Sequence, residues 1–224
     1  MPSLRWPVLL LLLALTACGG SRKPPAVPAV GANASQARLA GVPIVQLTES
    51  PELCHFVMAH AGITYRPVAD KREGAGCYLK DTIALSPDSL PLDREATTTC
   101  ALGAGVVVFE RTIVEPAALR HFGVPLKEMV QWGTYACRTR NSRAGAPISE
   151  HATANAIDIG AFVLADGRKV TVLDGWDGSS AERAFLREVH DGACGIFHGV
   201  IGPEGDAQHR NHFHLDMGAW RFCQ

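Results

Sequence analysis

Residues that can hold a metal ion gather in the C-terminal part of the chain. Six of the nine histidines occur from His151 onward, and three of these lie in the segment His-Arg-Asn-His-Phe-His-Leu-Asp at 209–216. Imidazole and carboxylate groups bind borderline divalent cations, and a catalytic zinc takes three protein ligands and leaves a fourth position open. This segment, together with His151 and Asp158, therefore predicts a metal site.

The spacing within the segment predicts how its side chains point. In a strand at 212–217, alternate residues would share one face, which gives His212, His214 and Asp216 on one side and Phe213, Leu215 and Met217 on the other. Two imidazoles about 7 Å apart along a strand can serve one site, one as ligand and its neighbour as base or second ligand. The alternatives are a chance cluster of surface histidines and a packed pair in the core.

The N-terminus predicts export. Residues 1–17 combine Arg5 with an apolar run at 8–15 that is too short to span a membrane. The run ends Leu-Thr-Ala-Cys18 and resembles a bacterial lipobox, which implies cleavage before Cys18 and acylation of its thiol; an ordinary secretory signal is the alternative. Gly19 rather than Asp follows, so nothing indicates retention in an inner membrane. The expected location is the cell envelope, at the periplasmic face of the outer membrane if the cell is Gram-negative.

Composition predicts a linker and one folded domain. The segment after Cys18 is rich in Gly, Ser, Pro and Ala, and we expect a flexible linker over 18–45 and a single domain over 46–224. The net charge of −1 and the lack of a basic run argue against nucleic acid as a partner. No sequence feature identifies a protein activator.

The cysteines predict disulfides. Six of the seven cysteines remain when Cys18 is set aside, and an even number in an exported chain is typical of an oxidising compartment. Because none is in a Cys-x-x-Cys pair, zinc-ribbon and thioredoxin interpretations are disfavoured. Sequence alone does not select the pairing, and nearest-neighbour pairing (54–77, 100–137, 194–223) is a guess. The six candidates are Cys54, Cys77, Cys100, Cys137, Cys194 and Cys223.

Local patterns predict an α+β fold, with helices in the first half and a small antiparallel sheet in the second. Ser50 as N-cap predicts a helix at 51–61, and the long apolar run at 98–114 predicts a buried helix. The capping box Ser179-x-x-Glu182 predicts a helix to about residue 190. The other expected elements are a strand at 83–85, a helical turn at 116–122, and strands at 129–136, 156–164, 170–173 and 212–217.

The motif Ser149-Glu-His-Ala-Thr-Ala-Asn-Ala-Ile-Asp158, followed later by His-Phe-His at 212–214, resembles the zinc peptidases of the D-Ala-D-Ala carboxypeptidase, lysostaphin and hedgehog superfamily. Their first motif is Ser-x-His-x-x-Gly-x-Ala-x-Asp, and Ala154 stands here in place of its glycine. From about Gln46 to Cys223 the chain also resembles the bacterial extensin-like C-terminal domain family. The resemblance implies a hedgehog- or peptidase-like fold and a zinc site.

Carried over residue by residue, the resemblance makes His151, Asp158 and His214 the zinc ligands. Either of two local structures would bring His151 and Asp158 together: a turn through the small residues at 152–155, or a helix, because seven residues approach two turns. A competing site would use His212 and His214 as joint ligands, with Asp158 pointing elsewhere.

His212 is the expected general base, with a fourth ligand or a partner of a ligand as its alternatives. Carboxypeptidases of the superfamily have glutamate where this chain has Asn211, which favours the endopeptidase branch. His209 is a second catalytic candidate, for substrate contact or proton relay, with a solvated loop as the alternative. Arg138 is placed to hold a substrate carboxylate or an oxyanion, unless it forms a structural salt bridge.

Two further side chains have supporting roles in this hypothesis. Asp216 would orient His212 or His214 through a hydrogen bond, or would be a plain strand-end aspartate. Ser149 shapes the turn rather than acting as a nucleophile, since no Gly-x-Ser-x-Gly elbow surrounds it.

These observations favour an exported, zinc-dependent endopeptidase that acts on the peptide cross-links of peptidoglycan. Its expected partners are peptidoglycan peptides and, through the lipid anchor, a membrane. The alternative is a metal-containing cell-wall binding or structural lipoprotein without catalytic activity. A serine or thiol hydrolase is disfavoured because the cysteines are expected to be paired.

Overall fold

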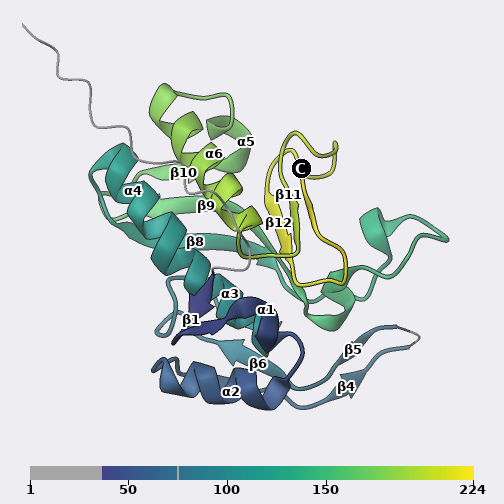
Figure 1. Ribbon diagram of the computed structural model, residues 1–224. Coiled ribbons are helices and arrows are strands. Elements are labelled where there is room, and N and C mark those ends of the chain that lie inside the picture. Colours follow the sequence, from purple (N-terminus) through teal and green to yellow (C-terminus); the bar gives the residue numbers. More distant parts are fainter. Residues whose placement is uncertain (1–36, 75) are drawn as a thin grey trace, which may run out of the picture.

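The computed structural model describes residues 37–74 and 76–224. The expected signal peptide, Cys18 and most of the expected linker lie outside the described residues. Within them, an N-terminal region of short helices and small sheets packs against a larger sheet with its own helices (Figure 1). None of the helices in this part of the chain has the length and apolar character needed to cross a membrane.

The N-terminal region contains more strands than expected. A three-stranded antiparallel sheet has the order β3-β6-β7, and the hairpins β1-β2 and β4-β5 are separate from it. The strand expected at 83–85 is confirmed within β6, but the other strands of this region were not expected. The elements are β1 (Arg38–Leu39), β2 (Val42–Pro43), α1 (Ile44–Leu47), α2 (Pro51–His60), β3 (Arg66–Pro67), β4 (Lys71–Arg72), β5 (Tyr78–Leu79), β6 (Thr82–Leu85) and β7 (Ala96–Thr99).

Ordered structure begins before residue 46, inside the range expected as linker. Leu39, Ile44 and Leu47 are all buried in the core. Burial of these three side chains removes apolar surface from water and holds the segment against the domain. The next helix, α2, starts as expected, because the Ser50 hydroxyl accepts a hydrogen bond from the Leu53 amide at 3.2 Å.

The apolar run forms the central buried helix. Every residue of α3 (Cys100–Phe109) is buried, and a π-helical turn (Glu110–Val114) connects it to α4 (Glu115–Phe122). The first two residues of the expected helix belong to β7 instead, because Thr99 is the N-cap. Gly105 allows close packing: a Cβ there would lie 2.4 Å from the end of the Met217 side chain and 3.1 Å from the Phe197 ring.

The larger sheet carries the C-terminal half. Its order is β10-β9-β12-β11-β13, and β8, which lies off this path, also pairs with β9. All neighbours are antiparallel except β11 and β13, which are parallel. The strands are β8 (Leu126–Gly133), β9 (Ala156–Leu164), β10 (Lys169–Thr171), β11 (Gly199–Ile201), β12 (Phe213–Asp216) and β13 (Phe222–Cys223).

Strand β9 has the predicted bounds, and β12 is one residue shorter at each end than the strand expected at 212–217. The other two neighbours of β9 differ more. Strand β8 begins three residues earlier than predicted and ends at Gly133. The strand expected at 170–173 stops at Thr171, because the Thr171 hydroxyl accepts from the Asp174 amide at 3.1 Å and caps the short helix α5 (Val172–Gly175).

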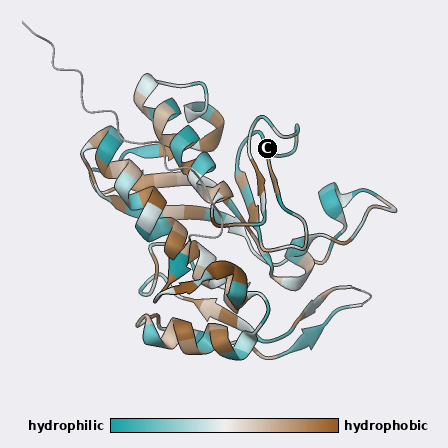
Figure 2. Cartoon of the chain, viewed as in Figure 1, coloured by the Kyte–Doolittle hydropathy of each residue, from teal (hydrophilic) through white to brown (hydrophobic). Residues whose placement is uncertain are grey.

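Helices cover one face of the larger sheet. Helix α6 (Ser180–Cys194) packs on α4 and on β11, so that α4 and α6 lie in front of the sheet in Figure 1. The predicted capping box is confirmed, with reciprocal bonds between Ser179 and Glu182. Hydrophobic residues recur along the strands of this sheet and in α1 (Figure 2), where they join one continuous core.

All six cysteines of the described residues form intramolecular disulfides, as predicted, but the guessed pairing is wrong in two of three bonds. The bonds are Cys54–Cys100, Cys77–Cys137 and Cys194–Cys223. Only the last joins nearest neighbours in the sequence. Packing of α2 against α3 brings Cys54 to Cys100, and hairpin β4-β5 lies beside the segment before Arg138. The fold is thus α+β, with small antiparallel sheets and three disulfides.

Candidate metal centre

Three donor atoms from distant parts of the sequence meet at one point. His151 Nε2 lies 3.1 Å from Asp158 Oδ1 and 3.2 Å from His214 Nδ1, and the last two atoms are 3.0 Å apart. The three atoms form an almost equilateral triangle, as the predicted convergence of these residues requires. Asp158 points into the group, so the alternative arrangement in which it points elsewhere is wrong.

Sheet register explains why two of the three meet. His214 on β12 stands directly opposite Asp158 on β9 in an antiparallel pair. Side chains at directly opposed positions have Cβ atoms about 4.5–5.5 Å apart, close enough for their polar ends to touch. Phe213 and Leu215 are fully buried on the other face, as the predicted alternation requires.

His151 reaches the same point from a turn, not from a helix that also contains Asp158. It lies in the 3-10 turn Glu150–Thr153, and Ser149 caps this turn by accepting a hydrogen bond from the His151 amide at 3.4 Å. Ala154 then takes a left-handed conformation, with φ of 54°, and sends the chain into β9. The superfamily motif has glycine at this position, and the observed φ shows why glycine suits it.

The outer hydrogen bonds decide where the protons of the two imidazoles sit. His151 Nδ1 donates to the Thr134 carbonyl oxygen at 3.3 Å, and His214 Nε2 donates to Asp216 Oδ2 at 3.0 Å. Both acceptors lack a hydrogen to give. In the neutral rings, therefore, the inner nitrogens carry lone pairs that face each other and the Asp158 carboxylate. Three converging lone pairs require a positive charge among them, either a proton or a metal ion.

The donor set fits zinc. Zinc bonds of about 2.0–2.2 Å in a tetrahedral shell put ligand atoms about 3.3 Å apart, close to the separations observed here. Two imidazole nitrogens and one carboxylate oxygen are ligands of the type that catalytic zinc sites use. The carboxylate of Asp216 and the Thr134 carbonyl orient the two rings, as outer partners of metal-binding histidines do.

Without a metal, a bound proton supplies the positive charge that the converging lone pairs require. Burial alone would lower the pKa of His214, but hydrogen bonds to Asp158 and Asp216 outweigh it and raise that pKa to about 9. Burial would likewise raise the pKa of Asp158, yet its close contacts with His151 and His214 hold it well below its ordinary value. The metal-free group is therefore a carboxylate paired with a protonated His214 at neutral pH.

His212 lies next to the triangle but is not one of its corners. Its Nε2 is 3.6 Å from Asp158 Oδ1, and its Nδ1 donates to Asn211 Oδ1 at 2.9 Å. With the proton held at Nδ1, Nε2 presents a lone pair toward the site. Burial lowers the pKa of His212 to about 4, against the opposing effect of Asp158, so the ring is neutral near pH 7. A general base must be in this state.

His209 is buried beside both other histidines of the segment. Its ring centre is 5.0 Å from that of His212 and 5.6 Å from that of His214. Asp206 Oδ1 accepts from His209 Nδ1 at 2.6 Å and from the His209 backbone amide at 3.1 Å. Because His209 is only 7 % exposed, the solvated-loop alternative is wrong.

Arg138 and His209 face a common cavity of about 230 Å³, which His214 and Asp216 also line. Among residues 37–74 and 76–224, Arg138 forms no ion pair, and its only side-chain hydrogen bond is a long one to the Thr139 carbonyl at 3.5 Å. The structural salt bridge considered as its alternative is thus absent from the described residues. The guanidinium is available to an anionic group in the cavity.

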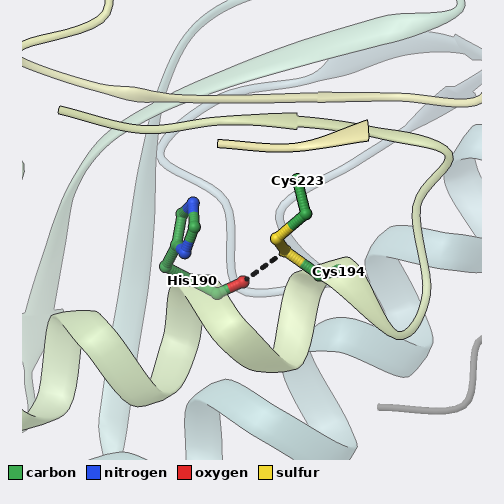
Figure 3. A group of neighbouring side chains, drawn as sticks. All are labelled: His190, Cys194 and Cys223. Atoms are coloured by element: carbon green, nitrogen blue, oxygen red, sulfur yellow. Dashed lines mark hydrogen bonds between the residues drawn. A yellow bond between two sulfur atoms is a disulfide. The ribbon is translucent and has the colours of Figure 1, made fainter. Parts of the chain in front are cut away.

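A second group with metal-binding residue types occurs at His190, Cys194 and Cys223. Figure 3 shows that the two sulfur atoms are bonded to each other across helix α6 and β13. A disulfide offers no thiolate, and His190 Nε2 donates to the backbone oxygen of Gln224 at 3.0 Å. This group is a structural crosslink, not a metal site.

Sequence reasoning missed two side chains at the site. Asp206 was not singled out, although its place three residues before His209 is the spacing of an aspartate that binds the backbone of its own turn. Trp132 was also missed, although its ring centre lies 5.4 Å from that of His212. No local sequence pattern predicts that Trp132 lies at the site, since its position depends on strand pairing.

These features describe a disulfide-bonded α+β domain with a histidine–aspartate–histidine group at the edge of a polar cavity. The chain belongs to the family described as extensin-like protein C-terminus, whose model matches residues 52–224. Comparison with curated proteins gives no match, and comparison with solved structures gives none either.

Proposed function

We propose that the protein is a zinc-dependent endopeptidase that cleaves peptide cross-links in peptidoglycan. The observation that carries the proposal is the triangle of His151 Nε2, Asp158 Oδ1 and His214 Nδ1, in which outer hydrogen bonds leave all three lone pairs pointing inward. A bound zinc ion would supply Lewis acidity toward a peptide carbonyl and would lower the pKa of a water molecule to about 7.

The remaining steps fall to side chains of the chain itself. His212 accepts a proton at Nε2 from the attacking water, since Asn211 occupies its Nδ1 proton. Arg138 binds a carboxylate or the developing oxyanion from the cavity side. His209, held by Asp206, contacts the substrate or relays a proton to the leaving amine. Asn211 in place of a glutamate supports the endopeptidase over the carboxypeptidase reaction.

The proposed location rests on the sequence alone. An export signal and an acylated Cys18 would hold the domain at the cell envelope, at the periplasmic face of an outer membrane where the cell has one. The three disulfides support an oxidising compartment. Peptidoglycan is the abundant peptide-bearing polymer there, which is why its cross-links are the proposed substrate.

Digestion of purified peptidoglycan by the zinc-loaded protein, with products identified by mass spectrometry, tests the proposal. We expect cross-linked fragments to become monomeric. His212→Ala should retain one zinc per chain while hydrolysis falls roughly 10²–10⁴-fold, because the base is lost and the Lewis acid stays. Loss of zinc in this variant would make His212 a ligand. Inactivity of the intact zinc-loaded protein on every cell-wall substrate would favour the binding-module alternative.

A further inference from the structure

An exposed tryptophan forms part of the wall of the site. Trp132 lies on β8 and remains 50 % exposed, whereas Gln131, just before it, is buried. Its ring centre is 5.4 Å from that of His212, whose Nε2 in turn is 3.6 Å from Asp158. An exposed aromatic ring is common on protein surfaces, but its position directly beside the candidate base is not explained by packing alone.

Strand pairing is irregular at this tryptophan. In the pairing of β8 with β9, Gln131 stands opposite Ile159 and Gly133 opposite Asp158. Trp132 on β8 and Gly160 on β9 therefore have no paired residue on the opposite strand. Irregularities of this kind re-aim side chains and are frequent next to active sites. Here the irregularity occurs where the indole lies against Gly160.

Gly160 makes room for the indole. A Cβ at residue 160 would lie 2.2–2.5 Å from the Cε2, Nε1 and Cζ2 atoms of Trp132, so any other residue would displace the ring. One face of the indole is thus covered by the β9 backbone. Its Nε1 has no hydrogen-bond partner among the described residues. What remains free is an apolar surface with one polar donor, fixed in place beside His212.

The two flanks of the candidate metal centre differ in chemistry. Arg138 and His209 line a polar cavity on one flank, and Trp132 adjoins His212 outside that cavity. A peptide bound with one part in the arginine cavity and its scissile bond beside His212 would have the indole within reach of the residues outside the cavity. Planar peptide units and small aliphatic side chains pack favourably on such a surface.

We propose that Trp132 is a substrate-binding residue that packs against the peptide flanking the scissile bond on the His212 side. This inference rests on the proposed function, because the substrate is taken to be a peptidoglycan peptide. It adds an apolar subsite outside the arginine cavity, and it makes Gly160 the residue that allows the indole to lie close to β9.

The test uses soluble cross-linked muropeptides and the zinc-loaded protein. Binding is measured by anisotropy of a fluorophore-labelled muropeptide on rapid mixing, and KM and kcat by mass spectrometry of products. Trp132→Ala should weaken binding and raise KM roughly tenfold, with kcat changed less than about twofold and one zinc still bound. Trp132→Phe should restore most of the binding. Gly160→Ala should resemble Trp132→Ala, because it moves the ring without deleting it.

Phe56→Ala is the matched control, since Phe56 is an exposed aromatic residue on α2 in the N-terminal region. It should leave binding and KM unchanged. Unchanged muropeptide binding in Trp132→Ala, or a fall in kcat with unchanged binding, would overturn the subsite. Absence of muropeptide binding to the intact protein would also overturn it. Binding that depends on Trp132 without any hydrolysis would support the subsite and refute the proposed endopeptidase activity.

Discussion

The two groups of metal-binding residue types in this molecule have similar compactness and opposite chemistry. At His151, Asp158 and His214, outer acceptors hold the ring protons away from the centre, so three lone pairs converge. At His190, Cys194 and Cys223, the two sulfur atoms form a disulfide and offer no thiolate to a metal. Proximity of donor atoms therefore does not make a metal site. The location of protons and covalent bonds around those atoms does.

Removal of a candidate ligand should give the largest difference in zinc affinity between the two groups. His214→Ala or His151→Ala should lower zinc affinity more than about 100-fold, beyond the effect typical of an outer partner, because two donors cannot complete the shell. His190→Ala, the matched control, should keep one zinc per chain. Competition with a chromophoric chelator measures both. Equal zinc loss in the His190 variant would place a metal at the second group after all.

Removal of the crosslink at the second group should act on stability instead. The double variant Cys194→Ser and Cys223→Ser should lower the free energy of unfolding by about 2–4 kcal/mol, because the unfolded chain regains the freedom that the bond removed. Denaturant unfolding measures the change. Zinc affinity should stay within twofold of the intact protein. A large change in zinc affinity with stability intact would contradict the division of roles between the two groups.

The outer partner of His214 should have an intermediate effect. Asp216→Asn keeps the shape of the side chain but removes the charge that accepts the His214 Nε2 proton. We expect zinc affinity to fall about 10–100-fold while the fold is retained. Chelator competition gives the affinity, and circular dichroism checks the fold. Unchanged affinity would show that the orientation of His214 is set by packing alone.

The smallest effect concerns the turn between the first two ligands. Ala154 has a φ of 54°, which costs an alanine about 1–2 kcal/mol relative to glycine. Ala154→Gly should therefore raise the free energy of unfolding by roughly 0.5–1 kcal/mol, after the entropy that glycine gains in the unfolded chain is subtracted. Denaturant unfolding of metal-free protein measures it. A loss of stability would mean that packing of the Ala154 methyl group outweighs the backbone strain.

Sequence patterns predicted the features that depend on neighbouring residues. The apolar segment before Asp166 and Gly167 has the predicted bounds as β9, and the Ser179 capping box opens α6 as expected. The alternation in β12 also holds, because it follows from the geometry of a single strand. Convergence of the three ligand residues was predicted through the motif, which carries information about long-range contact that composition lacks.

Features set by long-range packing were not predicted. Cys54 pairs with Cys100 because α2 packs on α3, and no local signal reports that contact. Trp132 joins the site only because the pairing of β8 and β9 shifts register at that residue. The strand expected after Val170 fails for a local reason, since Thr171 begins a helical turn that competes with extension.

The bond between Cys77 and Cys137 makes one wall of the site dependent on the oxidation of two thiols. It fixes the backbone directly before Arg138 to hairpin β4-β5, which is otherwise a peripheral excursion. While the thiols are reduced, the segment that carries the guanidinium lacks this anchor, whereas Asp158 and His214 face each other through the pairing of β9 with β12, which does not involve this bond. If the domain binds zinc and a peptide as proposed, reduction of this bond should weaken peptide binding more than zinc binding. Oxidation of Cys77 and Cys137 would then be the step after which the segment before Arg138 is fixed for substrate binding.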